Sequence, residues 1–265
     1  MNFHDRVALT LEDGVAHVRL DRPDKLNALD DAMFDGLVAA GAHLLATPRV
    51  RCVVLSGAGL AFCAGLDLAM MERIGDADLV ARTHGEANRL QQAALVWREL
   101  PVPVIAAIHG VCFGGGLQIA GGADVRVCAP DARLAVLEVK WGLVPDMGGF
   151  VLWRGNVRDD VLRELTFTAR EFSGEEGAAL GFATHIDPDP LARATVLARG
   201  IASRSPDAVR AAKALANRAH DRTTAEILAA ESETQARLIG TPNQREAVAA
   251  GLARRPPAFA DPEGG

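Results

Sequence analysis

The chain has 265 residues, 49% of them apolar, so it can bury a large core as one domain or as a domain with a small appendage. Its formal net charge of −6 argues against a general nucleic-acid binder, because such proteins usually present a basic face. The four cysteines form no CxxC pair and lie in apolar stretches, which is typical of buried free thiols in a reducing compartment.

The first residues contain the charges of Asp5 and Arg6 and no long apolar run. No signal peptide or membrane-spanning helix is therefore expected, and a cytoplasmic protein without a membrane partner is favoured.

The first third of the chain reads as short strands with tight turns. Residues 7–11 and 15–20 are apolar-rich and flank Glu12-Asp13-Gly14, which predicts a hairpin. A helical pattern follows over residues 30–46. Residues 50–56 have the continuous apolar centre that is typical of a buried parallel strand.

Strand and helix signals then alternate along the chain. Residues 79–100 have helical spacing that Pro101 ends, and residues 104–108 and 125–128 read as buried strands. A glycine-rich turn and a short helix over 117–123 lie between these strands. This alternation predicts an α/β fold.

The composition changes to alanine, arginine and glutamate near residue 205. Residues 208–218, 224–239 and 243–253 have helical spacing, and no strand signal accompanies them. We therefore expect a core domain over residues 1–204 and a helical region over 205–265. That region is too small for an independent core, so it should pack on the main body or on neighbouring subunits.

Two glycine-rich turns follow buried strands, at residues 56–68 and 109–118. The second contains three consecutive glycines, Gly114-Gly115-Gly116, which let the backbone approach a ligand and leave its N–H groups uncovered. Two such turns facing each other could hold one oxyanion between two N–H groups. One such donor typically stabilises a transition state by about 3–4 kcal/mol.

Other interpretations of these turns are a purely structural role or nucleotide binding. Gly57-Ala58-Gly59 resembles part of GxGxxG, but Phe62 stands where the third glycine belongs. A phosphate-binding P-loop is excluded because no Gly-Lys-Ser/Thr follows Gly116.

Four motifs in order make the pattern specific. They are residues 20–29 (LDRPDKLNAL), 61–68 (AFCAGLDL), 103–116 (PVIAAIHGVCFGGG), and residue 138 with 142–149 (GLVPDMGG). Through these four motifs, taken in this order, the chain resembles the crotonase (enoyl-CoA hydratase/isomerase) superfamily over nearly its whole length.

The resemblance implies a spiral of ββα units with a C-terminal helical region that builds homotrimers, often paired into hexamers. It implies an acyl-CoA thioester substrate and no cofactor. The thioester carbonyl would lie between the N–H groups of Leu66 and Gly115. The remaining residues that it assigns to the substrate are Lys25, Leu26 and Ala28 at the nucleotide, Ala64, Asp67 and Leu68 along the adenine and pantetheine path, and Gly114, Trp141 and Pro145.

Two positions depart from the family pattern for CoA. Ala69 stands where relatives often carry a lysine, and Ala260 stands where some carry a lysine that meets the CoA phosphate. Arg254 or Arg255 could substitute, unless they only form a solvated helix end.

The expected catalytic residues depart further from the family pattern. Hydratases of the family use two glutamates to activate water, and these positions are Gln118 and Glu138 here. Glutamine can orient water but cannot accept a proton as a base. Dienoyl-CoA isomerases of the family carry carboxylates at the positions of Glu138 and Asp146, with an aspartate where Gln118 stands.

The favoured function is therefore double-bond isomerisation of an enoyl- or dienoyl-CoA. Glu138, in the apolar stretch AVLEV, would be the proton shuttle with its pKa raised by burial, and Asp146 would be the second carboxylate or a helix N-cap. Trp141 and Trp153 flank this segment. Packing is the favoured role for both, and forming walls of the acyl pocket is the alternative.

The alternatives left open are an altered hydratase in which Gln118 orients water, a non-catalytic acyl-CoA-binding protein and, more distantly, a nicotinamide dehydrogenase. No HxxxH pair or GxSxG motif occurs, so neither a metal site nor a hydrolase triad is expected.

Overall fold

The structure is a computed structural model that describes residues 1–71 and 78–262. Its main sheet has seven strands in the order β1-β2-β3-β4-β5-β7-β10. The bounds of these strands are β1 Asn2–Phe3, β2 Val7–Glu12, β3 Val15–Leu20, β4 Cys52–Gly57, β5 Val104–Ile108, β7 Val125–Cys128 and β10 His185–Ile186. The first three strands are antiparallel and the rest are parallel, which confirms the predicted α/β class.

A second sheet of three strands stands beside the first, in the order β6-β8-β9. Its strands are β6 Val111–Phe113, β8 Arg133–Ala135 and β9 Phe172–Ser173. Strands β5 and β6 are separated by two residues, so the chain passes directly from the main sheet into the second sheet before α4 begins. The predicted ββα repeat is visible in this passage and in β2-β3-α1.

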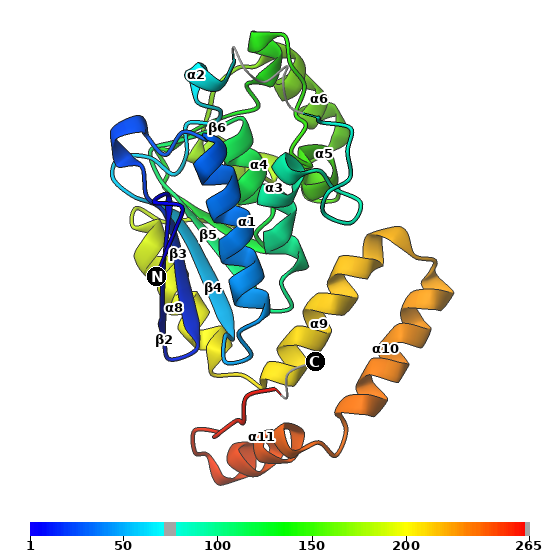
Figure 1. The fold of residues 1–265 in the computed structure, drawn as a ribbon. Coiled ribbons are helices and arrows are strands. Elements are labelled where there is room, and N and C mark those ends of the chain that lie inside the picture. The colour runs from blue at the N-terminus through cyan, green and yellow to red at the C-terminus, as the bar shows by residue number, and fades with distance from the viewer. Residues whose placement is uncertain (72–77, 263–265) are drawn as a thin grey trace.

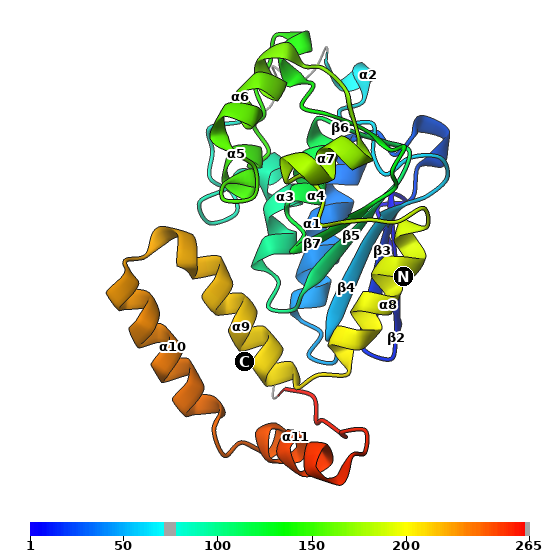
Figure 2. The ribbon, with the colours of Figure 1, turned by 180° about the vertical axis from the view of Figure 1, so that it is seen from behind.

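Helices cover both faces of the main sheet (Figures 1 and 2). Their bounds are α1 Asp31–Leu45, α2 Leu68–Met71, α3 Arg89–Glu99, α4 Gly115–Gly121, α5 Gly149–Trp153, α6 Asp159–Thr168, α7 Gly174–Leu180, α8 Pro190–Ala202, α9 Pro206–Arg218, α10 Thr224–Leu238 and α11 Pro242–Ala253. Short 3₁₀ turns lie at η1 Pro23–Lys25, η3 Glu138–Trp141 and η4 Ala219–Asp221.

The larger core lies between the main sheet and helices α1, α3 and α4, and Phe34, Trp97 and Phe62 are fully buried in it. On the opposite face, α8 packs the small side chains of Ala194 and Ala198 against β4, β5 and β7. The sheet is therefore buried on both sides, which explains the continuous apolar runs of its parallel strands.

The predicted helix over residues 79–100 is wrong in its first half. Helix α3 begins only at Arg89, because Asn88 and Gln91 form a reciprocal capping box, with hydrogen bonds of 2.9 and 3.0 Å. Before this cap, His84 and Ala87 pair as a bridge around Gly85, whose φ is +65°. Apolar spacing alone did not reveal this start signal.

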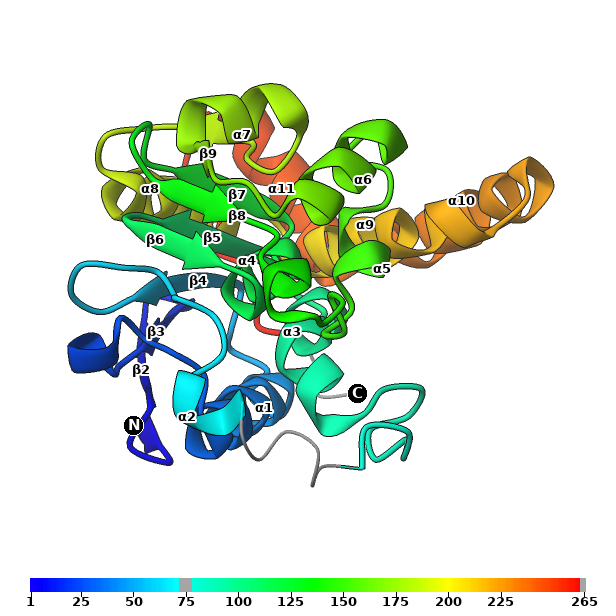
Figure 3. The same ribbon diagram turned by 90° about the horizontal axis from the view of Figure 1, so that it is seen from above.

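The three C-terminal helices match their predicted ranges within two residues at each end. Helices α9, α10 and α11 extend away from the body as an arm (Figures 1 and 3). The arm begins at Pro206, and the proposed division of the chain at residue 205 stays a prediction.

A buried lysine holds the base of the arm on the core. The Lys213 ammonium on α9 donates hydrogen bonds to Trp97 O at 3.1 Å, Val102 O at 2.9 Å and Asp124 Oδ2 at 2.8 Å. Its side chain is only 5% exposed, so this cluster joins the arm to the ends of α3 and β5.

All four cysteines are buried and free, as predicted. Burial raises the pKa of Cys63 and of Cys128 to about 12, so these thiols are unreactive at neutral pH. In the described part of the chain, no helix has the length and apolar character needed to cross a bilayer.

We expect Lys213→Met to lower the free energy of unfolding by about 3 kcal/mol, because it removes the ammonium that pairs with Asp124 and leaves Trp97 O and Val102 O without their buried donor. Urea denaturation measures the change. Arg193→Met, at an exposed position of α8, is the control and should shift the free energy by less than about 0.5 kcal/mol. Equal stability of the two variants would contradict the anchoring role of Lys213.

Candidate active site

The two glycine-rich turns meet at a cavity of about 810 Å³. Most of the residues assigned from the sequence line it. They are Lys25, Ala28, Ala64, Leu66, Asp67, Leu68, Gly114, Gly115, Gln118, Glu138, Trp141 and Asp146. Leu26 and Pro145 are outside the lining: Leu26 is exposed in a left-handed conformation at the end of η1, and Pro145 is buried.

The two turns are joined by a backbone bridge. Cys63 N donates to Val111 O at 3.0 Å, and Phe113 N donates to Cys63 O at 3.0 Å. This pairing brings the residues that follow each strand to the same rim of the cavity. It requires close contact, since a Cβ on Gly116 would lie 2.5 Å from Cys63 O.

The amide of Leu66 is free to bind a ligand. Leu29 pairs with Leu66 as a parallel bridge: Leu29 N donates to Gly65 O at 2.8 Å, and Asp67 N donates to Leu29 O at 2.9 Å. These bonds use Gly65 O and Asp67 N, which lie on either side of Leu66. The N–H of Leu66 itself therefore points away from Leu29. It has no partner among the described residues.

The amide of Gly115 lies close to Gly65, the residue that precedes Leu66. It is the first residue of α4, where backbone N–H groups have no partner within the helix. A Cβ built on Gly65 would lie 3.8 Å from Gly115 N and 2.9 Å from Phe113 O. The two predicted donors therefore lie on neighbouring segments of the same cavity, and their use as an oxyanion hole stays a prediction.

Glu138 presents its carboxylate next to this pair. A Cβ on Gly114 would lie 3.3 Å from Glu138 Oε1 and 3.9 Å from Oε2. Gln118 Nε2 donates to Oε1 at 2.7 Å, whereas Oε2 has no partner among the described residues. Burial raises the pKa of Glu138, and the nearby charge of Asp146 adds to this rise. One oxygen is thus held and the other is available to take a proton.

Asp146 is the second carboxylate of the cavity. Burial raises its pKa as well. It does not cap α5, because the N-cap position of that helix is Gly148, without a side-chain hydrogen bond. This removes the structural alternative considered from the sequence.

The two tryptophans have different roles. Trp153 is 2% exposed and packs edge-on against Phe182, with ring centroids 5.6 Å apart. Trp141 is 48% exposed and lines the cavity, so the packing role favoured for both from the sequence is wrong for Trp141.

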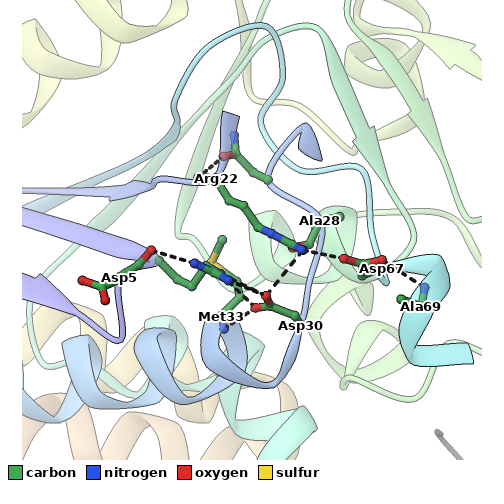
Figure 4. A network of polar contacts seen from close by, with 9 residues as sticks. Asp5, Arg22, Ala28, Asp30, Met33, Asp67 and Ala69 are labelled. Carbon is green, nitrogen blue, oxygen red and sulfur yellow. Dashed lines mark hydrogen bonds and ion pairs between the residues drawn. The ribbon is translucent and has the colours of Figure 1, made fainter. Parts of the chain in front are cut away.

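A network of charged groups supports the Leu66 side of the hole (Figure 4). Arg22 Nη1 donates to Asp67 Oδ2 at 2.6 Å and to Ala28 O at 3.1 Å, and it lies 3.5 Å from Asp30. The Asp67 carboxylate also accepts a hydrogen bond from Ala69 N at 3.0 Å. These hydrogen bonds from Ala69 and Arg22 lower the pKa of Asp67. Asp67, assigned to the CoA path, therefore has its charge bound within the protein.

Sequence reasoning missed Arg22 and the apolar wall of the cavity. That wall contains Leu29, Phe34, Leu79, Leu90, Phe113, Leu137, Leu143 and Met147. These residues come from separate elements and carry no local signal, so only the fold brings them together. Neither Arg254 nor Arg255 lines the cavity, and Arg255 pairs with Glu246 at 2.6 Å.

Across residues 1–71 and 78–262, no group of three or more His, Cys, Asp and Glu side chains is arranged to hold a metal ion. The chemistry that these residues offer is proton transfer beside a polarised carbonyl.

Comparison with known proteins identifies the family. The model of the family "Enoyl-CoA hydratase/isomerase" matches residues 10–262. The chain belongs to this family. It is an acyl-CoA enzyme of the enoyl-CoA isomerase/hydratase type, as the sequence predicted.

Individual relatives agree with this membership. The chain is 32% identical, over 94% of both chains, to the peroxisomal Delta(3,5)-Delta(2,4)-dienoyl-CoA isomerase of Arabidopsis thaliana. It is 37% identical to the mitochondrial human protein of that name, over 81% of this chain and 69% of the human one. Among solved structures, a putative enoyl-CoA hydratase from Streptomyces coelicolor A3(2) is 33% identical, with a TM-score of 0.86, over 97% of this chain and 94% of that one.

We expect Arg22→Met to lower kcat/KM about tenfold, because a loosened Leu66 segment misplaces one donor of the hole. Steady-state kinetics with a dienoyl-CoA, together with the melting temperature, measure the effect. Arg19→Met is the control, since Arg19 forms only an exposed ion pair with Asp21. Equal kcat/KM in both variants would contradict the supporting role of Arg22.

Proposed function

We propose that the protein converts 3,5-dienoyl-CoA thioesters into 2,4-dienoyl-CoA thioesters, without a cofactor. The observation that carries this proposal is the pair of half-buried carboxylates, Glu138 and Asp146, which line one cavity with Leu66 and Gly115. Relatives named as dienoyl-CoA isomerases, at 32% and 37% identity, support the choice of substrate.

The reaction moves one proton along the acyl chain. A base removes a proton from C2, and the electron pair of the C–H bond delocalises through the two double bonds into the thioester carbonyl. The negative charge on the carbonyl oxygen would be stabilised by the N–H groups of Leu66 and Gly115. Protonation at C6 then returns the electrons to carbon and leaves double bonds at positions 2 and 4.

Two carboxylates suit this reaction because C2 and C6 are four carbons apart. The Glu138 carboxylate lies next to Gly114, close to the hole and hence to C2. We assign the removal of the C2 proton to its free Oε2 and the delivery of a proton to C6 to Asp146. After turnover the proton must return from Glu138 to Asp146 or exchange with solvent.

The raised pKa values of the two groups serve this cycle. Glu138 must be charged and Asp146 protonated when the substrate binds. Burial favours the neutral form of each, and the two groups resist being charged together. The rate should therefore fall in acid as Glu138 becomes protonated, and in base as Asp146 loses its proton.

Hydration of an enoyl thioester fits the site less well. Gln118 uses Oε1 to accept from Met147 N and Gly149 N, and it uses one Nε2 hydrogen to reach Glu138. Only one amide hydrogen is left to orient a water molecule, and no second carboxylate stands at position 118.

We also propose that the chain assembles as a homotrimer or a hexamer through the arm. Helix α10 buries no residue within its own chain, and Leu228, Ile239 and Leu252 on the arm are 58%, 64% and 83% exposed. Such apolar surface is typical of an interface between chains. A cytoplasmic location stays a prediction; the relatives named above are peroxisomal and mitochondrial.

Incubation of the protein with 3,5-dienoyl-, 3-enoyl- and 2-enoyl-CoA tests the proposed reaction. We expect the 3,5-dienoyl substrate to give the conjugated 2,4-dienoyl product, identified by NMR. Glu138→Gln and Asp146→Asn should each lower kcat by about 10² to 10⁴-fold, since each removes one proton carrier.

The exposed variant Glu164→Gln is the control and should retain the wild-type rate. Water addition to the 2-enoyl substrate as the main activity would identify a hydratase instead. Binding of acyl-CoA with no product from any substrate would identify a non-catalytic binding protein.

Light scattering at micromolar concentration tests the assembly. We expect a mass three or six times that of the 27.9-kDa chain. A monomeric mass would contradict an assembly role for the arm.

A further inference from the structure

The buried amide of Gln118 lies between the two proton carriers. Its side chain projects from α4, and the residue is 1% exposed. Its Oε1 accepts hydrogen bonds from Met147 N and Gly149 N, both at 2.9 Å, and its Nε2 donates to Glu138 Oε1 at 2.7 Å. Two backbone donors face Oε1 and a carboxylate faces Nε2, so the amide has one favourable orientation.

On one side, this amide fixes the base. Glu138 lies in the 3₁₀ turn η3, and the Gln118 hydrogen bond holds its Oε1. Holding Oε1 directs the lone pairs of Oε2, which has no partner among the described residues. The Glu138 carboxylate can then meet C2 in one orientation rather than several.

On the other side, the same amide fixes the second carrier. The N–H of Met147 belongs to the peptide unit that joins it to Asp146, so the hydrogen bond to Gln118 Oε1 restrains that unit directly. The second bond, from Gly149 N, holds the first residue of α5. The segment that carries Asp146 is therefore attached to α4 at two points.

We infer that Gln118 is a positioning residue that sets the spacing of Glu138 and Asp146 by binding both segments through one uncharged side chain. Its neutrality is part of this role. A carboxylate at position 118 could still accept from Met147 N and Gly149 N, but it would place a second negative charge against Glu138 Oε1. The amide binds both sides without that repulsion. The inference deepens the proposed function and rests on it for the identity of the two carriers.

Two substitutions separate the two sides of this arrangement. Gln118→Glu keeps the acceptor for the two backbone N–H groups and removes the donor to Glu138. Gln118→Met has a similar length and removes both. In the pH profile of kcat/KM, we expect the acid limb of Gln118→Glu to move upward by about one unit or more.

Gln118→Met should move the acid limb upward by less, because it removes a donor without adding charge. Its kcat should fall by about 10²-fold, since the Asp146 segment is released as well. A purely structural role would lower the melting temperature without moving the acid limb.

Gln92 offers a matched control. It is a buried glutamine on α3 whose Nε2 donates to Glu99 Oε2 at 2.7 Å, and it is not part of the cavity lining. Gln92→Glu and Gln92→Met repeat the two changes beside a different glutamate. We expect both variants to lose stability while they retain the wild-type acid limb and kcat.

The titration of Glu138 itself gives a readout that needs no turnover. In protein labelled with ¹³C at glutamate side chains, comparison with Glu138→Gln assigns its carboxyl signal. We expect its midpoint to rise in the order wild type, Gln118→Met, Gln118→Glu. An unchanged midpoint in Gln118→Glu would overturn the inference. An inactive wild type that still shows this order would instead overturn the proposed reaction alone.

Discussion

The active site depends on the backbone bridge between the two glycine-rich turns. Cys63 is hydrogen-bonded to Val111 and Phe113, and this pairing ties the turn after β4 to β6 of the second sheet. Leu66 and Gly115, which follow this bridge, both line the cavity. Backbone donors suit this task because they are rigid and need no reorganisation when charge develops on a carbonyl oxygen.

The local sequence follows from this close approach. Gly65 has a φ of +87°, and a Cβ there would press on Phe113 O at 2.9 Å. Gly114 has a φ of +48° and leaves room for the Glu138 carboxylate. These two glycines allow the hole and the base to lie next to each other. The Arg22 network then fixes the outer side of the Leu66 turn (Figure 4).

The apolar wall of the cavity completes the chemistry. Low polarity strengthens hydrogen bonds to a developing oxyanion, and burial raises the pKa of both carboxylates, which favours their neutral forms. Gln118 adds a neutral hydrogen-bonding group at the one place where a further charge would oppose Glu138. Family membership agrees with this arrangement, and the choice of isomerisation rests on the two carboxylates.

Much of this arrangement could be predicted from the sequence, because its signals are local. The hairpin at Glu12-Asp13-Gly14, the buried strand Val104–Ile108 and the arm helices follow from turn residues and periodicity. The order of the motifs indicated Leu66, Gly115 and Glu138, and all three line the cavity. The capping box at Asn88 makes α3 shorter than the helix that apolar spacing predicts.

The contacts that depend on tertiary structure could not be predicted. Arg22 and Asp67 are 45 residues apart, and no spacing rule connects them. The two functions of Gln118 became visible only when α4, η3 and the start of α5 were seen together. Trp141 and Trp153 look alike in sequence, but Trp141 lies in η3 and lines the cavity, whereas Trp153 lies in α5 and packs against Phe182.

A crystal structure with a saturated acyl-CoA, which binds but cannot react, tests the central claim most directly. We expect the thioester oxygen to lie about 2.7–3.1 Å from both Leu66 N and Gly115 N, with Glu138 Oε2 beside C2. A carbonyl oxygen bound to neither amide, or a Glu138 carboxylate turned away from C2, would contradict the account.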